Sequence, residues 1–487
     1  MPECDFLIRG ATVVDGSGIE AIVGDVAVAG DRIVAIGADL DCDAGEVVDG
    51  EGLVLAPGFI DVHTHDDTNV IRTPEMLPKL SQGVTTVIMG NCGISAAPVR
   101  LRREPPDPMN LLGDASVFRY PTFAAYVDAV EAARPAVNVA ALVGHTALRQ
   151  NYMDRLDREA TASEIAAMRG QLVEALERGA LGLSTGLAYL SANAATTEEV
   201  LALAEPLAGA GALYTTHLRS ETAAILDAMS EAFRIGRESS VAVVISHLKC
   251  AGVDNWGRSS EVLEALDRAQ KSQAVSCDCY PYAAGSSTLD LRQVDERVEI
   301  KITWSEPHPE MAGRKLAEIA TEWRVDQIEA ARRLRPAGAI YHSISEEDVR
   351  RILRYPATMI GSDGLPNDPR PHPRLWGTFP RVLGRFVRDE ALFSLTEAVH
   401  KMTGLPAARF GLKGRGLVKE GFVADLVLFD PQRVKDAATY DDPMRPAEGI
   451  ARVWVNGVLS YVDGQPAGSR AGRFLKRSAM VTNLNQS

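Results

Sequence analysis

Phe59-Ile60-Asp61-Val62-His63-Thr64-His65-Asp66 is the stretch that most strongly determines the fold prediction, because a short apolar run ends in a His-x-His pair. Alternate side chains of a β-strand point to the same face, so the two imidazoles project together, about 6–7 Å apart at their Cα atoms. Two nitrogens at that spacing suit one metal ion, although polar residues also end ordinary strands. A metal site therefore requires further ligands elsewhere in the sequence.

Seven further runs rich in β-branched residues follow this one, and segments with helical periodicity, such as 162–178 and 260–271, separate them. The eight predicted strands span residues 59–62, 85–89, 139–143, 180–184, 213–216, 242–246, 274–278 and 358–362. Alternating strands and helices predict a parallel sheet, and eight βα units are what a closed barrel needs. We therefore expect an α/β fold in which residues 58–413 form a TIM-like (β/α)8 barrel.

The two ends of the chain differ in texture from the middle. Residues 1–57 and 414–487 carry short β-rich pieces between glycine and aspartate turns. Chain termini often lie close together, so both ends are predicted to build one small β-sandwich domain. Between the seventh and eighth strands, residues 285–350 exceed what one crossover needs, which predicts an inserted lid with helices at 309–323 and 327–335.

The ends of the predicted strands carry polar side chains that a barrel would bring to one opening. His217 and His247 follow the fifth and sixth strands, and Cys92 follows the second. Because the carboxyl ends of all barrel strands face the same side, these residues would join His63 and His65. Neutral imidazoles with a soft sulfur favour zinc over magnesium or calcium, so we expect a zinc site at this opening.

Asp363 ends the eighth predicted strand, within Ile360-Gly361-Ser362-Asp363-Gly364. On the motif alone, an ordinary turn aspartate before glycine is an equal alternative. At the mouth of a histidine-lined barrel, however, a carboxylate beside a zinc-bound water can accept the water's proton and pass it to a leaving group. Asp363 is therefore the predicted general base and acid.

Charge and cysteine content exclude several classes of protein. The 487 residues carry 51 Lys and Arg against 65 Asp and Glu, and the net charge of −14 repels nucleic acid and anionic membranes. Six cysteines are too few for a disulfide framework, the N-terminus lacks a secretion signal, and no apolar run approaches the ~20 residues that span a bilayer. We expect a cytoplasmic protein that acts on a small molecule, with no nucleic-acid or membrane partner.

Several motifs resemble one enzyme superfamily and, within it, one family. The resemblance to the amidohydrolase superfamily is carried by Pro57-Gly58-Phe59-Ile60-Asp61-Val62-His63-Thr64-His65, the strand-end His217 and His247, and Ser362-Asp363-Gly364. The motifs that resemble the N-acyl-D-amino-acid deacylases, the D-aminoacylase family, are Gln82-Gly83-Val84-Thr85-Thr86-Val87, Gly90-Asn91-Cys92-Gly93-Ile94-Ser95, Ser246-His247-Leu248-Lys249 and Met359-Ile360-Gly361-Ser362-Asp363-Gly364-Leu365-Pro366. The similarity covers essentially the whole chain, including the split β domain and the lid.

The resemblance implies zinc-dependent hydrolysis of N-acyl-D-amino acids, which releases a carboxylate such as acetate and the free D-amino acid. It also implies that Cys92, His217 and His247 hold one tight zinc ion, while His63 and His65 form a second, weaker site. The fourth predicted strand ends without the lysine that bridges two metals in many superfamily members, which argues against a cyclic-amide hydrolase of the dihydropyrimidinase or hydantoinase type. A non-catalytic barrel relative is the other alternative.

Five residues are predicted to bind the substrate. Arg374, in the loop after the last strand, offers a planar fork for the α-carboxylate. Lys249 and Tyr282 follow the sixth and seventh strands, and the resemblance implies that they add donors. Tyr189 and Ser287 are predicted to line the side-chain pocket. The sequence leaves open a hydrophobic or an acidic D-amino acid, and a monomer or a weak homo-oligomer.

Overall fold

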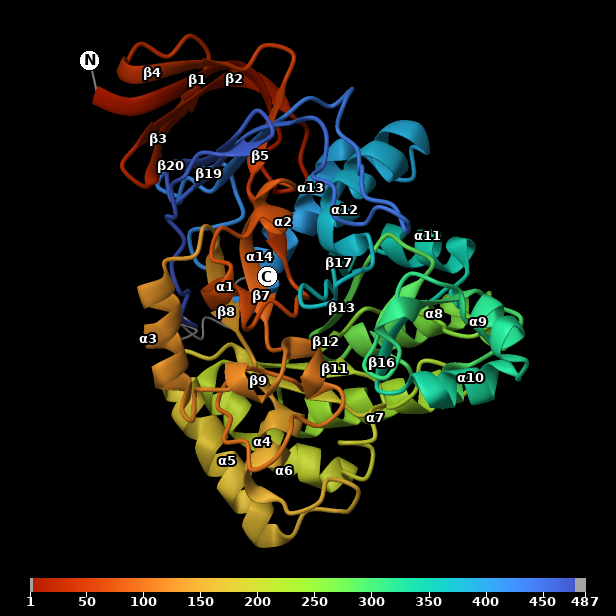
Figure 1. Cartoon of the computed structure of the whole chain (residues 1–487). Helices are drawn as coiled ribbons and strands as arrows, with labels where there is room; N and C mark the ends of the chain where they lie inside the picture. The colour runs from red at the N-terminus through yellow and green to blue at the C-terminus, as the bar shows by residue number, and fades with distance from the viewer. Residues whose placement is uncertain (1–2, 478–487) are drawn as a thin grey trace.

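The computed structural model describes residues 3–477, and strands from both ends of this part of the chain form one nine-stranded sheet (Figure 1). Its strands are β1 (Glu3–Val13), β2 (Ile22–Ala29), β3 (Arg32–Gly37), β4 (Asp43–Asp49), β5 (Val54–Pro57), β18 (Leu426–Phe429), β19 (Ile450–Val455), β20 (Val458–Val462) and β21 (Gln465–Pro466). Their order is β21-β20-β19-β18-β5-β1-β2-β3, with β4 paired to β1. β5 joins the halves, because it pairs antiparallel with β18 and parallel with β1. Residues 1–2 and 478–487 of the predicted composite domain lie outside the described residues.

This sheet is continuous, where the sequence predicted a sandwich of two sheets. The pairing of β1 with β5 starts at Thr12 opposite Val54 and continues for one more residue pair, which is enough to link the two halves. The sheet still curls around an apolar core, because the rings of Phe6 in β1 and Trp454 in β19 stack at 5.2 Å although β5 and β18 separate their strands. The domain therefore buries a core as a sandwich does, but within one sheet.

The middle of the chain forms a closed ring of parallel strands. Its segments are β6 (Phe59–Asp61), β7 (Val84–Met89), β8 (Asn138–Ala141), β9 (Val143–Gly144), β10 (Gly182–Gly186), β11 (Leu213–His217), β12 (Val243–Ile245), β13 (Val275–Cys279) and β17 (Thr358–Ile360). β8 and β9 are one strand interrupted at Leu142, so the ring has eight strands among the described residues. Backbone hydrogen bonds from Asp363 to His63 and from His65 to Gly364 close it between β17 and β6. All eight predicted strands are present, with ends within two residues of those expected.

Helices flank the ring on its outside (Figure 1). They are α1 (Asn69–Arg72), α2 (Leu77–Leu80), α3 (Phe123–Ala133), α4 (His145–Tyr152), α5 (Ala162–Glu177), α6 (Thr197–Ala210), α7 (Ile225–Glu238), α8 (Ser259–Gln270), α11 (Glu346–Arg354), α12 (Arg374–Arg381) and α13 (Leu395–Met402). α14 (Gly404–Phe410) instead packs Ala407 and Phe410 into an apolar core shared with residues of the barrel strands. The predicted helices 162–178 and 260–271 correspond to α5 and α8. α5 begins with a capping box, in which Thr161 and Glu164 satisfy each other's backbone N–H groups. No helix within residues 3–477 combines the length and apolarity needed to cross a bilayer.

Between β13 and β17 the chain builds an insertion with its own apolar core. It contains β14 (Gly285–Thr288), β15 (Ile300–Ser305), β16 (Ala337–Tyr341), α9 (Leu316–Trp323) and α10 (Gln327–Leu334). The predicted helix 327–335 is α10, but the predicted helix 309–323 is only partly present. Its first part is a 3-10 turn over Pro309–Met311. The left-handed backbone of Gly313, with φ at 89°, then prevents a continuous helix, and α9 begins only at Leu316.

Candidate functional site

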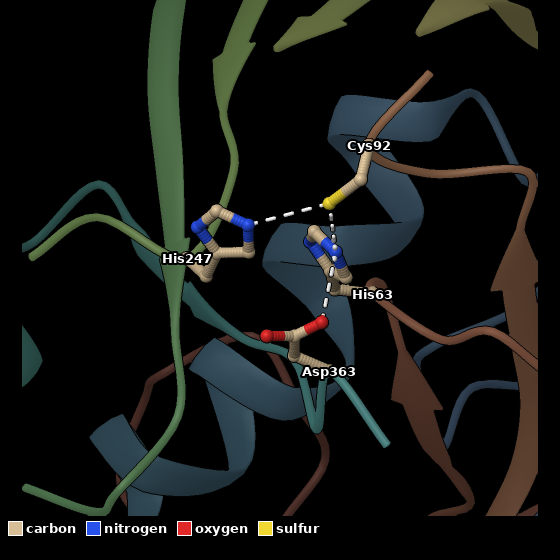
Figure 2. A group of neighbouring side chains, drawn as sticks. All are labelled: His63, Cys92, His247 and Asp363. Carbon is tan, nitrogen blue, oxygen red and sulfur yellow. Dashed lines mark hydrogen bonds and ion pairs between the residues drawn. The ribbon is translucent and has the colours of Figure 1, made fainter. Parts of the chain in front are cut away.

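Four side chains from distant segments meet at the carboxyl ends of the barrel strands (Figure 2). His63 follows β6, Cys92 follows β7, His247 follows β12 and Asp363 follows β17. The Sγ atom of Cys92 lies 3.2 Å from His63 Nε2 and 3.3 Å from His247 Nε2. Asp363 Oδ1 lies 3.5 Å from His63 Nε2. All four side chains are buried, and their donor atoms fall within 4.8 Å of one another, so one ion could contact several of them.

The backbone is left-handed at three of these residues. The φ angle is 53° at Cys92, 34° at His247 and 49° at Asp363. Side-chain-bearing residues rarely adopt this conformation, which costs about 1–3 kcal/mol and persists where the surroundings enforce it. Around Cys92 the enforcement is visible, because a Cβ on Gly90 or Gly93 would come within 2.3 Å or 2.7 Å of the backbone of adjoining strands. Strand packing therefore sets the turn that aims the thiol.

The two histidines of the His-x-His pair have different partners. His65 Nε2 lies 3.1 Å from Asp363 Oδ1, and His65 Nδ1 is buried with no hydrogen-bond partner in residues 3–477. His63 Nδ1 lies 3.2 Å from Asp278 Oδ1, while its other nitrogen faces the thiol. Asp278 was not predicted; it also accepts the backbone N–H of His247 at 2.9 Å. Its place at the end of the seventh predicted strand is the signal that could have identified it.

His217 and His247 lie with their rings nearly perpendicular, at a centroid distance of 4.5 Å. Between them is Glu221, which the sequence did not single out. Its carboxylate lies 3.0 Å from His247 Nδ1 and 3.5 Å from His217 Nε2, and accepts a hydrogen bond from Lys249 Nζ at 2.6 Å. Burial would raise the pKa of Glu221, but its electrostatic interactions with His217 and Lys249 outweigh this effect and hold the pKa far below its usual range.

Arg374 pairs with the predicted general base. Its Nη2 lies 2.8 Å from Asp363 Oδ2 and donates to the carbonyl of Ser286 at 3.1 Å. Burial would raise the pKa of Asp363, but the guanidinium of Arg374 and the hydrogen bond from His65 hold it well below its usual range. Arg374 Nε and Nη1 are buried yet have no hydrogen-bond partner in the described chain. Unpaired buried donors are costly, so these two nitrogens are suited to an anionic ligand.

Tyr280, rather than Tyr282, lies beside the two cations of the site. The guanidinium carbon of Arg374 lies 4.6 Å from the Tyr280 ring centre, and Lys249 Nζ lies 5.9 Å from it. The Tyr280 hydroxyl is buried and has no partner among the described residues. Tyr282 instead packs against the guanidinium of Arg381, at 4.6 Å. The position of Tyr280 directly after β13 is the sequence signal that favours it.

Tyr189 and Ser287, the predicted pocket residues, are neighbours at the same opening. The Tyr189 ring lies 4.8 Å from the ring of His217. Burial raises the pKa of Tyr189, and a hydrogen bond with Ser287 opposes this shift. Ser287 belongs to β14, and the carbonyl of its neighbour in that strand, Ser286, accepts a hydrogen bond from Arg374. The insertion therefore reaches the barrel opening.

A buried lysine joins the first and last strands of the ring. Lys79 Nζ donates to Asp61 Oδ2 at 2.8 Å and to Ser362 Oγ at 3.0 Å, and lies 3.2 Å from Asp66 Oδ2. Burial would lower the pKa of Lys79, but the charges of Asp61 and Asp66 outweigh it and raise the pKa. Asp61 also accepts the backbone N–H of Ser362 at 2.8 Å. The cluster thus holds β17 against β6. Asp363 follows β17, and His63 and His65 follow β6.

The chemistry of the donor set fits zinc. Burial would raise the pKa of Cys92, but the charges of His63 and His247 hold it well below its usual range, which favours the thiolate form that binds metals. The Nδ1 atoms of His65 and His217 are buried and without a hydrogen-bond partner in the part of the chain that the structure describes. A soft thiolate surrounded by imidazole nitrogens is typical of zinc sites.

A parallel barrel with such a donor set at the carboxyl ends of its strands defines a metal-dependent hydrolase. Residues 46–461 match the model of the amidohydrolase family, and the chain belongs to this family. The family membership expected from the sequence motifs is thereby confirmed.

Individual relatives cover nearly the whole chain. The D-aminoacylase of Alcaligenes xylosoxydans xylosoxydans is 51% identical over 475 residues, 98% of each protein. The N-acyl-D-aspartate deacylase of the same organism is also 51% identical over 475 residues, 97% of this chain and 95% of that protein. An N-acyl-D-glutamate deacylase structure from Bordetella bronchiseptica, complexed with zinc and a phosphonate mimic of the tetrahedral intermediate, matches with a TM-score of 0.94 and 45% identity over 97% of this chain and 100% of that one. A D-hydantoinase structure, with a TM-score of 0.63 and 17% identity, shares the fold alone.

Proposed function

We propose that this chain is a zinc-dependent deacylase that hydrolyses the amide bond of N-acyl-D-amino acids, releasing a carboxylate such as acetate and the free D-amino acid. The observation that carries the proposal is the buried metal-ligand set beside the guanidinium of Arg374, two nitrogens of which have no partner in residues 3–477. One side of the site can hold a metal, and the other can hold a carboxylate. The relatives named D-aminoacylase and N-acyl-D-aspartate deacylase support this substrate class.

In this proposal Cys92, His217 and His247 hold one tight zinc ion, and His63 and His65 provide a second, weaker site beside the same thiolate. When bound, zinc polarises the amide carbonyl and lowers the pKa of a water molecule towards ~7. The low pKa of Cys92 supports its place as a ligand, because the thiolate coordinates without first losing a proton.

Asp363 is the proposed general base and general acid. Its carboxylate is ionised beside Arg374 and His65, so it can accept a proton from the attacking water and return it to the leaving nitrogen. The backbone N–H of Asp363 donates to the carbonyl of His63 at 2.7 Å, which fixes the carboxylate against the metal ligands. One residue can therefore serve both proton transfers without moving far.

The substrate's α-carboxylate is proposed to bind Arg374, Lys249 and Tyr280. Tyr280 takes the role that the sequence predicted for Tyr282, because the ring of Tyr280, and not that of Tyr282, lies beside both cations. A carboxylate here would engage the unpaired nitrogens of Arg374, and charge-assisted hydrogen bonds are the strong ones.

The insertion is proposed to act as a lid, with Tyr189 and Ser287 lining the side-chain pocket, because Ser287 of β14 contacts Tyr189 at the barrel opening. The proposed units are a composite β domain of residues 1–57 and 414–487, a catalytic barrel of residues 58–413, and the lid at 285–350. A single chain supplies every proposed group, so a monomer or weak homo-oligomer suffices. The free cysteines of the described chain fit a cytoplasmic setting.

Parallel kinetics on N-acetyl-D-methionine, N-acetyl-D-glutamate and their L-enantiomers, with metal analysis of the purified protein, test the proposal. Anchoring by metal, carboxylate site and side-chain pocket should make the L-forms at least ~10²-fold poorer, about 2.7 kcal/mol. Preference for an L-substrate would overturn the proposal. Activity confined to hydantoins or dihydropyrimidines would favour the cyclic-amide hydrolase, and zinc-loaded protein without activity would favour a non-catalytic relative.

A further inference from the structure

Glu221 is a largely buried carboxylate of the site to which the proposed reaction assigns no role. Its side chain is 12% exposed and it follows β11 by four residues. Three groups surround its oxygens: His247 Nδ1 at 3.0 Å, His217 Nε2 at 3.5 Å and Lys249 Nζ at 2.6 Å. Lys249 Nζ also lies 2.8 Å from His247 Nδ1, so the carboxylate and the ammonium group compete for this nitrogen, and only the carboxylate can accept a proton from it. One carboxylate thus contacts both histidines assigned to the tight metal site and one cation of the carboxylate site.

The contacts of Glu221 involve one nitrogen of each imidazole and leave the other nitrogen facing away from the carboxylate. His247 presents Nε2 to the Cys92 thiol at 3.3 Å, and His217 Nδ1 has no hydrogen-bond partner within the described residues. A neutral imidazole carries its proton on one nitrogen and can bind a metal only through the other. A carboxylate that accepts a hydrogen bond from the N–H group of an imidazole therefore determines which of the two ring nitrogens is left to bind the metal.

We propose that Glu221 is a positioning residue, which fixes the tautomer and orientation of both His217 and His247 so that His217 Nδ1 and His247 Nε2 are the metal-binding nitrogens. The same carboxylate anchors Lys249, so the metal side and the carboxylate side of the site are held by one group. This role presupposes the proposed zinc site. In a rival role Glu221 would itself be a metal ligand. The metal would then bind the Glu221 carboxylate together with His217 Nε2 and His247 Nδ1, the two nitrogens that face it.

The variant Glu221→Gln tests this role, because an uncharged amide is a weaker acceptor of nearly the same size. Zinc affinity, measured by competition with a chromophoric chelator, should fall about 10- to 100-fold. Glu231→Gln is the matched control, because Glu231 is equally buried, at 12% exposure, but pairs with Arg219 instead. Glu231→Gln should bind zinc as the wild type does, and both zinc-free variants should unfold near the same temperature. If Glu221→Gln does not fold, Glu221→Asp, which withdraws the charge from the rings, should show the same loss of affinity.

Two results separate failure of this inference from failure of the proposed function. Wild-type protein that binds no zinc would overturn both. Tight zinc in the wild type together with unchanged affinity in Glu221→Gln would overturn the positioning role alone. Cobalt-loaded Glu221→Gln should keep the visible absorption bands of the wild type, whereas altered bands would indicate that Glu221 is a ligand and overturn the role in another way.

A pair of cysteines in the composite sheet supports a second, independent inference. Cys4 lies in β1 and Cys42 directly precedes β4, and these strands pair in parallel with Cys4 opposite Ala44. The two Sγ atoms lie 2.6 Å apart, and both thiols are free. Cys4 is buried, whereas Cys42 is partly exposed and can meet a solute oxidant. A disulfide bond of about 2.0 Å therefore requires only a small side-chain movement.

We infer that Cys4 and Cys42 form a disulfide on exposure to a peroxide. The Cys42 thiol attacks the peroxide O–O bond, which gives a sulfenic acid and one water. The Cys4 sulfur then attacks the sulfenic sulfur, the S–O bond breaks, and a second water leaves with the remaining protons. Two thiols are oxidised by two electrons and one hydrogen peroxide is reduced to two waters.

Peptide mapping tests the pair. Zinc-loaded protein is treated with hydrogen peroxide, remaining thiols are alkylated, and trypsin is added. The expected product joins the peptide ending at Arg9 to the peptide ending at Arg72, each of which contains one cysteine. The cross-link should vanish with dithiothreitol, be absent in Cys42→Ser, and raise the unfolding temperature of the wild type only. Full alkylation of both residues after peroxide treatment would overturn the inference.

Discussion

Replacing Tyr280 with phenylalanine removes one hydroxyl from the proposed carboxylate site and leaves its ring in place. The hydroxyl is buried without a partner in residues 3–477, so its loss leaves no other protein group unpaired. A hydrogen bond to a charged acceptor contributes about 1.5–3 kcal/mol, and because 1.36 kcal/mol is tenfold, kcat/KM should fall about 10- to 160-fold. The loss should appear mainly in KM, because the carboxylate is bound equally in the ground and transition states.

The assay compares N-acetyl-D-methionine with its C-terminal amide, which lacks the carboxylate. Tyr280→Phe should impair hydrolysis of the acid and spare the amide, and Tyr282→Phe, whose ring packs on Arg381, is the matched control. Equal losses on acid and amide would refute contact between Tyr280 and the carboxylate. A larger loss in Tyr282→Phe than in Tyr280→Phe would return the role to Tyr282.

Three further variants test separate parts of the site. Cys92→Ala should purify folded but with little zinc and no activity, and full zinc occupancy by metal analysis would contradict its role as a ligand. Asp363→Asn should keep its zinc yet lose about 10²–10⁴-fold in kcat, so near-normal turnover would remove it as the proton carrier. Lys79→Met leaves the buried carboxylates of Asp61 and Asp66 uncompensated and should lower the free energy of unfolding by about 3–5 kcal/mol in urea titrations. A loss below about 1 kcal/mol would show that this pairing contributes little.

Much of the barrel could be predicted because its strands are apolar, β-branched and bounded by turns. Segments such as 85–89 and 242–246 are short, rich in β-branched residues and flanked by helical segments, which favours strands over buried helices. The predicted helix 309–323 was partly wrong, because apolar periodicity does not register the left-handed turn at Gly313. The continuous end sheet was also missed, because it depends on the brief pairing of β5 with β1, which leaves no mark in the composition.

The site was predictable where barrel geometry alone brings residues together. His217 and His247 end neighbouring strands, so their closeness follows from topology. Glu221 was missed because its contacts depend on the direction of a loop side chain. Tyr280 could have been preferred to Tyr282 because it directly follows β13, which ends at Cys279, whereas Tyr282 lies two residues further along the loop and packs on Arg381.

The pairing of β5 with β18 has a consequence for folding during synthesis on the ribosome. The ribosome synthesises the first five strands early, but the partner of β5, Leu426–Phe429, emerges only after the entire barrel has been synthesised. Until then β5 presents an unpaired edge, the kind of surface on which nascent chains join wrongly to one another. Messages truncated before β18 should therefore yield aggregating fragments rather than a small stable enzyme. Pairing of β18 with β5 covers the exposed edge and ends the risk of aggregation during synthesis.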